Sequence, residues 1–262
     1  MSLIYQDREA NPFCLLENEY LIVKDGETVA DVLKWQENRI KKVTVKPIDS
    51  PLHGKIKPKN VEQECLIDML IDKRTTVKEI TGTHGSGKSF LGMLAAFQAI
   101  NSGEFSKMVF IRNTIETKDS NPIGHLKGSY MDKMSVWAGV LTDFLGGDEQ
   151  LDNYINRGLI DIEHLGFLRG RSFKDSVLFA TEAEHFTRKH VQLLLGRVGE
   201  GSILILEGDY RQIDAKAFEQ DNGMLAAIDR LKGNNLFGYV HLKESVRSET
   251  AKLADLLDEE RT

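Results

Sequence analysis

Short apolar runs alternate with segments of helical periodicity from about residue 60 onward. The runs predict strands, and the periodic segments between them predict helices. The expected strands are 77–81, 107–111, 159–163, 176–181, 202–207 and 237–242. The expected helices are 61–72, 88–101, 130–145, 187–197, 222–232 and 248–259. This alternation is typical of βαβ units, so it predicts an α/β domain with a mostly parallel sheet and helices on both faces.

The first 57 residues follow a different pattern. Two extended-looking pieces, Glu19 to Val23 and Val43 to Val45, flank a short amphipathic stretch from Val29 to Trp35. This pattern predicts a small β-rich appendage. A stretch rich in proline, glycine and serine then marks a boundary. We therefore expect an appendage with its linker at 1–57 and the α/β domain at 58–262.

Composition places the chain among ordinary globular proteins, with 262 residues, 41% hydrophobic and 28% charged. Its apolar runs are far shorter than the roughly 18 residues of a membrane span, and acidic residues interrupt the first twenty. We expect a cytoplasmic protein without a membrane partner. Two cysteines, Cys14 and Cys65, without metal-ligand spacing indicate neither a disulfide framework nor a zinc site.

The charge pattern limits the class of partner. A net charge of −6 argues against a protein that coats nucleic acid through a uniformly basic surface. The segment 39–59 is locally rich in lysine and is the first place to expect phosphate contacts, although a solvated linker would have the same composition.

The strongest motif follows the expected strand 77–81. Residues 82–89, Gly-Thr-His-Gly-Ser-Gly-Lys-Ser, match the pattern GxxxxGK[ST]. The glycines let backbone N–H groups curl around phosphate oxygens, the following helix presents its positive end, and Lys88 adds a full charge. The hydroxyl of Ser89 is suited to Mg²⁺. The predicted nucleotide-binding residues here are Thr83, His84, Gly85, Ser86, Gly87, Lys88 and Ser89.

Acidic residues at the ends of two strands complete the predicted site. Strand 176–181 ends at Thr181-Glu182, where many ATPases carry Asp-Glu, so the usual carboxylate near the metal is missing. Glu182 is the candidate catalytic base, the alternative being an exposed acid at a helix start. Asp209 and Gln212 follow strand 202–207, and Asp209 is the expected partial replacement on the metal side.

Gln63 suggests which base the nucleotide carries. A glutamine amide can satisfy the N6 donor and the N7 acceptor of adenine together, and guanine offers no such pair. Gln63 precedes the glycine-rich loop and so favours ATP over GTP. A glutamine on a helix is also an ordinary surface residue, and this alternative stays open.

These residues resemble one family. From Gln63 to the end the chain is similar to the PhoH-like ATPases, a P-loop family related to superfamily 1 helicases, and it looks most like the PhoH half of PIN–PhoH fusion proteins. The resemblance lies in several motifs in the family's order. They are 58–63 on the adenine side, 82–89, 111–112, 123–128, 168–172, 196–199, 208–214, 222–223 and 246–248.

The chain departs from the family's pattern at two places. Its DEAQN motif is here Thr181 to His185, and the proline after its first arginine is Asn113. The first 57 residues also have no acidic constellation spaced for two metals, so we expect no PIN nuclease domain in them.

The resemblance implies roles for several residues. A RecA-like or superfamily 1 helicase-like fold is implied, with arginines that clamp phosphates of ATP or of a bound strand. The candidates are Arg112, Arg169, Arg171, Arg197 and Arg247. Arg197 is expected to bind the nucleotide, Arg247 to act as a finger on a neighbour's nucleotide, and Gln212 to sense the γ-phosphate. For each arginine, a salt bridge at the surface is the alternative.

Three functions follow as hypotheses. The first is a Mg²⁺-dependent ATPase that binds ATP and ADP and acts on RNA or single-stranded DNA. The second, raised by Thr181, is a degenerate module that holds ATP as a structural ligand. The third is a processive helicase, which would require a homo-oligomer such as a hexameric ring because one chain has room for a single RecA-like lobe.

Overall fold

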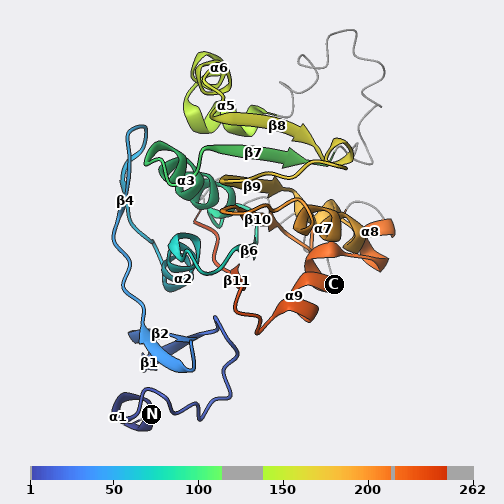
Figure 1. Cartoon of the computed structure of the whole chain (residues 1–262). Coiled ribbons are helices and arrows are strands. Elements are labelled where there is room, and N and C mark those ends of the chain that lie inside the picture. Colours follow the sequence, from blue (N-terminus) through green and yellow to red (C-terminus); the bar gives the residue numbers. More distant parts are fainter. Residues whose placement is uncertain (1, 114–137, 214–215, 247–262) are drawn as a thin grey trace, which may run out of the picture.

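A six-stranded parallel sheet forms the centre of the molecule (Figure 1). The computed structural model describes residues 2–113, 138–213 and 216–246. The strand order is β11-β6-β10-β9-β7-β8, and every neighbouring pair is parallel. The strands are β6 (Val77–Gly82), β7 (Lys107–Arg112), β8 (Ile160–His164), β9 (Ser176–Thr181), β10 (Ile203–Gly208) and β11 (Phe237–Leu242). The predicted α/β class and all six predicted strands are confirmed.

Helices cover both faces of this sheet. One face carries α2 (Val61–Ile71), α3 (Lys88–Asn101), α5 (Gly139–Leu145) and α6 (Asp148–Asn156). The other carries α7 (Arg188–Leu195) and α9 (Gly223–Leu231), with α8 (Lys216–Gln220) and two short 3-10 helices, η1 (Leu165–Phe167) and η2 (Ala183–His185), in the connections. The expected helix 248–259, and residues 130–137 of another, lie outside the described residues. Helix α6 was not predicted.

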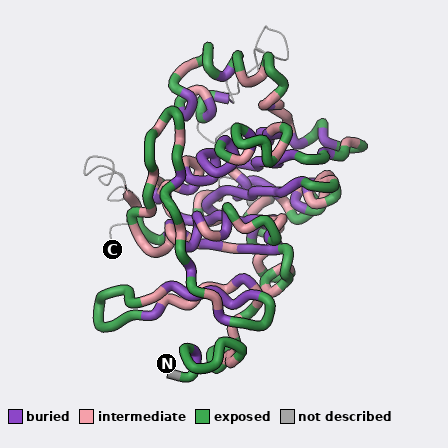
Figure 2. Tube along the Cα trace, turned by 60° about the vertical axis from the view of Figure 1, so that its left-hand side comes forward, coloured by how far each residue is buried: buried purple, intermediate pink, exposed green. Residues whose placement is uncertain are grey.

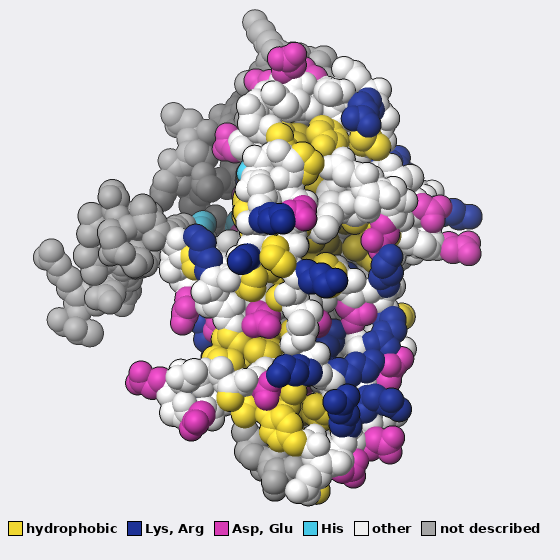
Figure 3. Space-filling view, turned by 90° about the vertical axis from the view of Figure 1, so that its left-hand side faces the viewer, with side chains coloured by type: hydrophobic (Ala, Val, Ile, Leu, Met, Phe, Trp, Pro, Cys, Tyr) yellow, Lys and Arg dark blue, Asp and Glu magenta, His cyan; other side chains and the backbone are white. Residues whose placement is uncertain are grey.

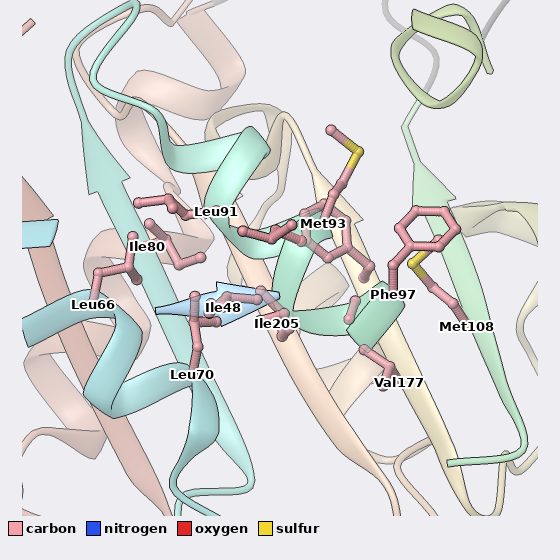
Figure 4. Close-up of a cluster of buried hydrophobic side chains, with 14 of the residues drawn as sticks. Ile48, Leu66, Leu70, Ile80, Leu91, Met93, Phe97, Met108, Val177 and Ile205 are labelled. Carbon is pink, nitrogen blue, oxygen red and sulfur yellow. The ribbon is translucent and has the colours of Figure 1, made fainter. Parts of the chain in front are cut away.

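Strand residues alternate between two apolar cores. In β10, Ile203 and Ile205 pack on the side of α3, whereas Leu204 and Leu206 pack on the side of α7 and α9. The strands are accordingly buried along most of their length (Figure 2). Figure 4 shows the core between α2, α3 and the sheet. Helix α3 lies close on the sheet, because a Cβ atom on Gly92 would stand 2.9 Å from Phe179.

The N-terminal appendage is a small antiparallel sheet. It contains β1 (Tyr20–Asp25), β2 (Thr28–Gln36) and β3 (Arg39–Lys42) after a short helix α1 (Ser2–Gln6). The amphipathic stretch 29–35 is therefore a strand, and the strand expected at 43–45 lies instead at 39–42. Regular pairing ends at Lys42, although the N–H of Val43 still donates to the Val32 carbonyl of β2 at 2.8 Å and the Val43 side chain is buried in the main core.

Packing crosses the predicted boundary at residue 57. The hairpin of β4 (Ile48–Ser50) and β5 (Gly54–Ile56) contributes Ile48 to the core beneath α3. The small sheet is joined to α2 by polar contacts, in which Lys34 Nζ lies 3.1 Å from Asp68 and 2.8 Å from Asp72. The division into an appendage and an α/β domain remains a prediction.

Candidate nucleotide site

A polar cleft of about 820 Å³ lies at the carboxyl edge of the sheet. Parallel α/β sheets bind their ligands at this edge, where the loops after the strands meet. The cleft is lined by the glycine-rich loop, the first residues of α3, Arg112, and the ends of β9 and β10. Most of the predicted site residues therefore meet in one place.

The glycine-rich loop has the curled backbone that the motif predicts. Gly82, Gly85 and Gly87 all have positive φ, at 151°, 68° and 91°, which favours glycine. No side chain caps the amino end of α3, so its first N–H groups remain available for an anion. The Lys88 ammonium donates to the carbonyl of Thr83 at 3.0 Å, which keeps its charge within the loop.

A buried carboxylate that the sequence analysis did not select lies behind Ser89. Glu207, near the end of β10, accepts from the Ser89 hydroxyl at 3.0 Å on one oxygen. Its other oxygen accepts from Thr181 of β9 at 2.8 Å. Burial raises the pKa of Glu207, while the charge of Lys88 and the two hydroxyl groups act in the opposite direction. The sequence did contain a signal for Glu207: it directly follows the apolar run 203–206 and lies on the same face of the strand as Ile203 and Ile205.

Glu182 is held by an arginine. Its backbone is in the left-handed region, with φ of 53°, and its carboxylate lines the cleft. The guanidinium of Arg112 donates through two nitrogens to the two carboxylate oxygens, with the Nε contact at 3.0 Å. The predicted base and one predicted phosphate clamp are thus partners in this arrangement.

Asp209 and Gln212 also line the cleft. The carboxylate of Asp209 accepts from the backbone N–H of Arg211 at 3.1 Å, and its own N–H donates to Glu184 at 3.0 Å. Burial raises the pKa of Glu184 to about 8, with backbone hydrogen bonds opposing this and the charge of Glu207 adding to it. Through the hydrogen bond from Asp209 N–H, Glu184 links η2 to the residue that follows β10. The role of Asp209 as a metal-side carboxylate remains a prediction.

Gln63 supports the loop in this structure. Its side-chain oxygen accepts from Lys59 N–H at 2.9 Å, and its side-chain nitrogen donates to the Ser86 carbonyl at 2.9 Å. The residue is buried and does not line the cleft. Contact with adenine would require these hydrogen bonds to be exchanged, so selection of adenine by Gln63 stays a prediction.

Among the described residues, the other candidate arginines, Arg169, Arg171 and Arg197, do not line the cleft. Arg197 follows the carboxyl end of α7, beside the residues that precede β9, and donates to the carbonyl of Arg171 at 2.9 Å. The crossover through α7 has returned the chain to the amino edge of the sheet, so Arg197 does not line the nucleotide cleft of its own chain. Arg171 forms an ion pair with Glu163. Arg247 lies outside the described residues.

The donor atoms in the cleft fit Mg²⁺ held together with phosphate. Among the described residues there is no group of three His, Cys, Asp or Glu side chains placed to hold a metal ion alone. Mg²⁺ usually keeps several waters and takes one or two protein oxygens along with phosphate oxygens. The hydroxyl of Ser89, backed by Glu207, provides such a hard oxygen donor.

The fold and the loop together define a class of protein. A parallel α/β sheet with a glycine-rich loop after β6 and an uncapped helix behind it is a P-loop nucleotide-binding fold.

In the parts of the chain that the structure covers, every helix is too short or too polar to span a bilayer.

Comparison with known proteins gives the family. The sequence model of the family described as PhoH-like protein matches residues 55–257, so the chain belongs to the PhoH-like protein family. This match confirms the resemblance found in the sequence.

Individual relatives agree with this assignment. The chain is 31% identical over 226 residues to Protein PhoH2 of Mycolicibacterium smegmatis, covering 85% of this chain and 52% of that protein. It is 34% identical over 212 residues to Protein PhoH2 of Bacillus subtilis, covering 77% and 48%. The chain thus spans about half the length of these curated relatives. Among solved structures, the Pyrococcus furiosus Hef helicase domain matches with a TM-score of 0.32 at 11% identity, covering 66% of this chain and 36% of that one.

Proposed function

We propose that this protein binds ATP with Mg²⁺ and hydrolyses it, and that hydrolysis is coupled to binding of RNA or single-stranded DNA. The observation that supports it most is the cleft, where the P-loop, a hydroxyl backed by a buried carboxylate and an acidic side chain at the end of β9 face one space. A triphosphate needs this combination of an anion cradle, a metal-side oxygen and a group to orient water.

Each residue has a role that its chemistry suits. The N–H groups of the loop and the Lys88 ammonium bind the phosphates, and the Ser89 oxygen binds the metal. Mg²⁺ held there would neutralise part of the phosphate charge. Glu182 orients the attacking water and accepts its proton, and Gln212, on the same cleft, responds to the γ-phosphate.

Contact with a nucleic acid strand rests on charge at the surface. Four lysines of the segment 39–59 are exposed and have no ion pair with any described residue: Lys46, Lys55, Lys57 and Lys59. On the face shown in Figure 3, basic side chains alternate with acidic and apolar ones. Binding through such scattered cations should be weak alone and should fall with added salt, and a homo-oligomeric ring would multiply the contacts.

A second candidate function is a module that holds ATP without turning it over. Two observations favour it. Thr181 stands where many ATPases have aspartate, and Glu182 is paired with Arg112 rather than free to bind water. In that case ATP would stabilise the fold or an assembly as a bound ligand.

Single-turnover phosphate release in the presence of Mg²⁺ separates the two functions. Release of phosphate supports the enzyme, whereas ATP that stays intact on the protein for hours supports the module. Lys88→Ala should abolish ATP binding, and Glu182→Gln should retain binding but lose turnover. Repeating the assay with RNA and with single-stranded DNA tests the coupling, and unchanged rates with both would contradict it.

A further inference from the structure

Three polar side chains meet on the α3 face of the sheet, each from a different element. Ser89 is in the first turn of α3, Thr181 ends β9, and Glu207 lies near the end of β10. Phe179, on the same face of β9 as Thr181, and Ile205, on the same face of β10 as Glu207, pack into the core beneath α3. The trio therefore continues one face of the sheet into the cleft.

The hydrogen bonds within the trio orient the Ser89 oxygen. A hydroxyl has one proton to donate and two lone pairs to offer. Because Ser89 donates its proton to Glu207 at 3.0 Å, both lone pairs of its oxygen stay available for a cation. Thr181 donates to the second carboxylate oxygen at 2.8 Å, and this contact fixes the plane of the carboxylate.

We propose that Glu207 is the metal-side carboxylate of this nucleotide site, taking from β10 the position that an aspartate at Thr181 would have occupied on β9. This assignment rests on the proposed binding of Mg²⁺ with a nucleotide. Glu207 orients Ser89 and would accept hydrogen bonds from waters around a bound metal. Strand β10 lies next to β6, which carries the P-loop, and β9 lies one strand further away.

The other carboxylates at the cleft are engaged elsewhere. Glu182 is paired with Arg112, Glu184 accepts from the backbone N–H of Asp209, and Asp209 accepts hydrogen bonds from Arg211. Ser89 is hydrogen-bonded to Glu207. The positive charge of Lys88 also acts on Glu207, and the same charge would interact with the phosphates of a bound nucleotide. The site is therefore built around a carboxylate on β10.

The test measures how strongly Mg²⁺ tightens nucleotide binding. A fluorescent ADP analogue is titrated onto the full chain, first in EDTA and then at stepped Mg²⁺ concentrations, and Mn²⁺ bound with ADP is followed by electron paramagnetic resonance. Glu207→Gln should reduce the tightening by Mg²⁺ about tenfold or more, the range found when groups that orient metal ligands are removed. Affinity in EDTA should stay within about twofold, because the loop and Lys88 are unchanged.

A matched control comes from the neighbouring strand. Glu79 of β6 is fully buried, and its carboxyl has no hydrogen-bond partner in the described part of the chain. The adjacent residues Lys78 and Ile80 point to the opposite face, where Ile80 packs into the core beneath α3, and Glu79 does not line the cleft. Glu79→Gln should leave the Mg²⁺ response unchanged. Urea unfolding of each variant reports any loss of stability separately.

A double variant keeps the assignment testable if Glu207→Gln folds poorly. Thr181→Asp with Glu207→Thr moves the carboxylate back to β9 and should keep the Mg²⁺ response within about threefold of the parent, since the hydroxyl–carboxylate pair is retained. An unaltered Mg²⁺ response in Glu207→Gln, or a large loss in Asp209→Asn instead, would overturn the assignment. Absence of any nucleotide binding by the parent would overturn the proposed function itself.

Discussion

Arg112 and Glu182 form a forked ion pair across the edge of the cleft. Two nitrogens of the guanidinium of Arg112, at the end of β7, contact the two carboxylate oxygens of Glu182, which follows β9. The side chains are partly exposed, at 25% and 39%, so the pair contributes little to stability. The pair instead fixes the orientation of the Glu182 carboxylate, because the planar guanidinium contacts both of its oxygens.

Arg112→Ala should therefore impair catalysis more than binding. We expect kcat for ATP hydrolysis to fall by about 10- to 100-fold, because a water-orienting group that is out of place loses most of its effect. KM for ATP should change by less than about threefold. Steady-state phosphate release measures both constants. A large rise in KM with an unchanged kcat would mean that Arg112 contacts the phosphates instead.

Gln63→Ala should weaken binding of ATP and GTP alike. The side chain joins Lys59 to Ser86, so its removal leaves the Ser86 carbonyl unpaired and the loop less ordered. A lost hydrogen bond of this kind costs about 1 kcal/mol, or roughly fivefold in affinity. Competition titrations with both nucleotides measure the losses. A loss confined to ATP would instead support the reading of adenine by Gln63.

The central sheet was predictable because its strands are buried on both faces. Runs such as 203–206 leave no polar face, and the helices between them have clear periodicity. The strands of the appendage were harder to predict from the sequence. The apolar pattern at 43–45 predicts a strand, but the pairing with β2 ends at Lys42 and the Val43 side chain packs in the main core. Tertiary contacts overrode the pattern there.

The site was predictable where the motif is contiguous in sequence. The P-loop from Gly82 to Ser89 depends on local backbone freedom, and it meets the ends of β9 and β10 as parallel strands require. The partners of side chains were not predictable in the same way. Glu207 and Ser89 are hydrogen-bonded although 118 positions separate them in the sequence. Arg197 is kept from the cleft by the direction in which the α7 crossover returns the chain.

Lys78 should make stability depend on pH above neutrality. Its ammonium donates to the carbonyls of Met69 and Asp72 at 2.6 Å each. Burial lowers the pKa of Lys78 to about 7, with the charge of Asp72 opposing this and that of Lys34 adding to it. Since the unfolded chain has a lysine pKa of about 10.4, it binds more protons than the folded chain between these values. Stability should therefore rise with pH from about 7 to 10, by at most about 1.4 kcal/mol per pH unit.

The comparison of Lys78→Met with the parent isolates this effect. The difference in free energy of unfolding between the two proteins, from urea titrations at pH 6 to 9.5, should move in favour of the parent as pH rises. Other titrating groups contribute to both proteins and cancel. A difference that stays constant with pH would show that Lys78 keeps an ordinary pKa in the folded chain.

Gly92→Ala tests how closely α3 must lie on the sheet for the site to form. Alanine favours a helix over glycine by about 1 kcal/mol, yet here its Cβ would stand 2.9 Å from a ring carbon of Phe179. We expect a net loss of about 1–3 kcal/mol in urea unfolding, because overpacking outweighs propensity. Gly139, at the start of α5 with open space around it, provides the control, and Gly139→Ala should be neutral or slightly stabilising. Because a displaced α3 carries Ser89 away from Glu207, Gly92→Ala should also reduce the tightening of nucleotide binding by Mg²⁺, and full retention of it would mean that helix placement and metal response are independent.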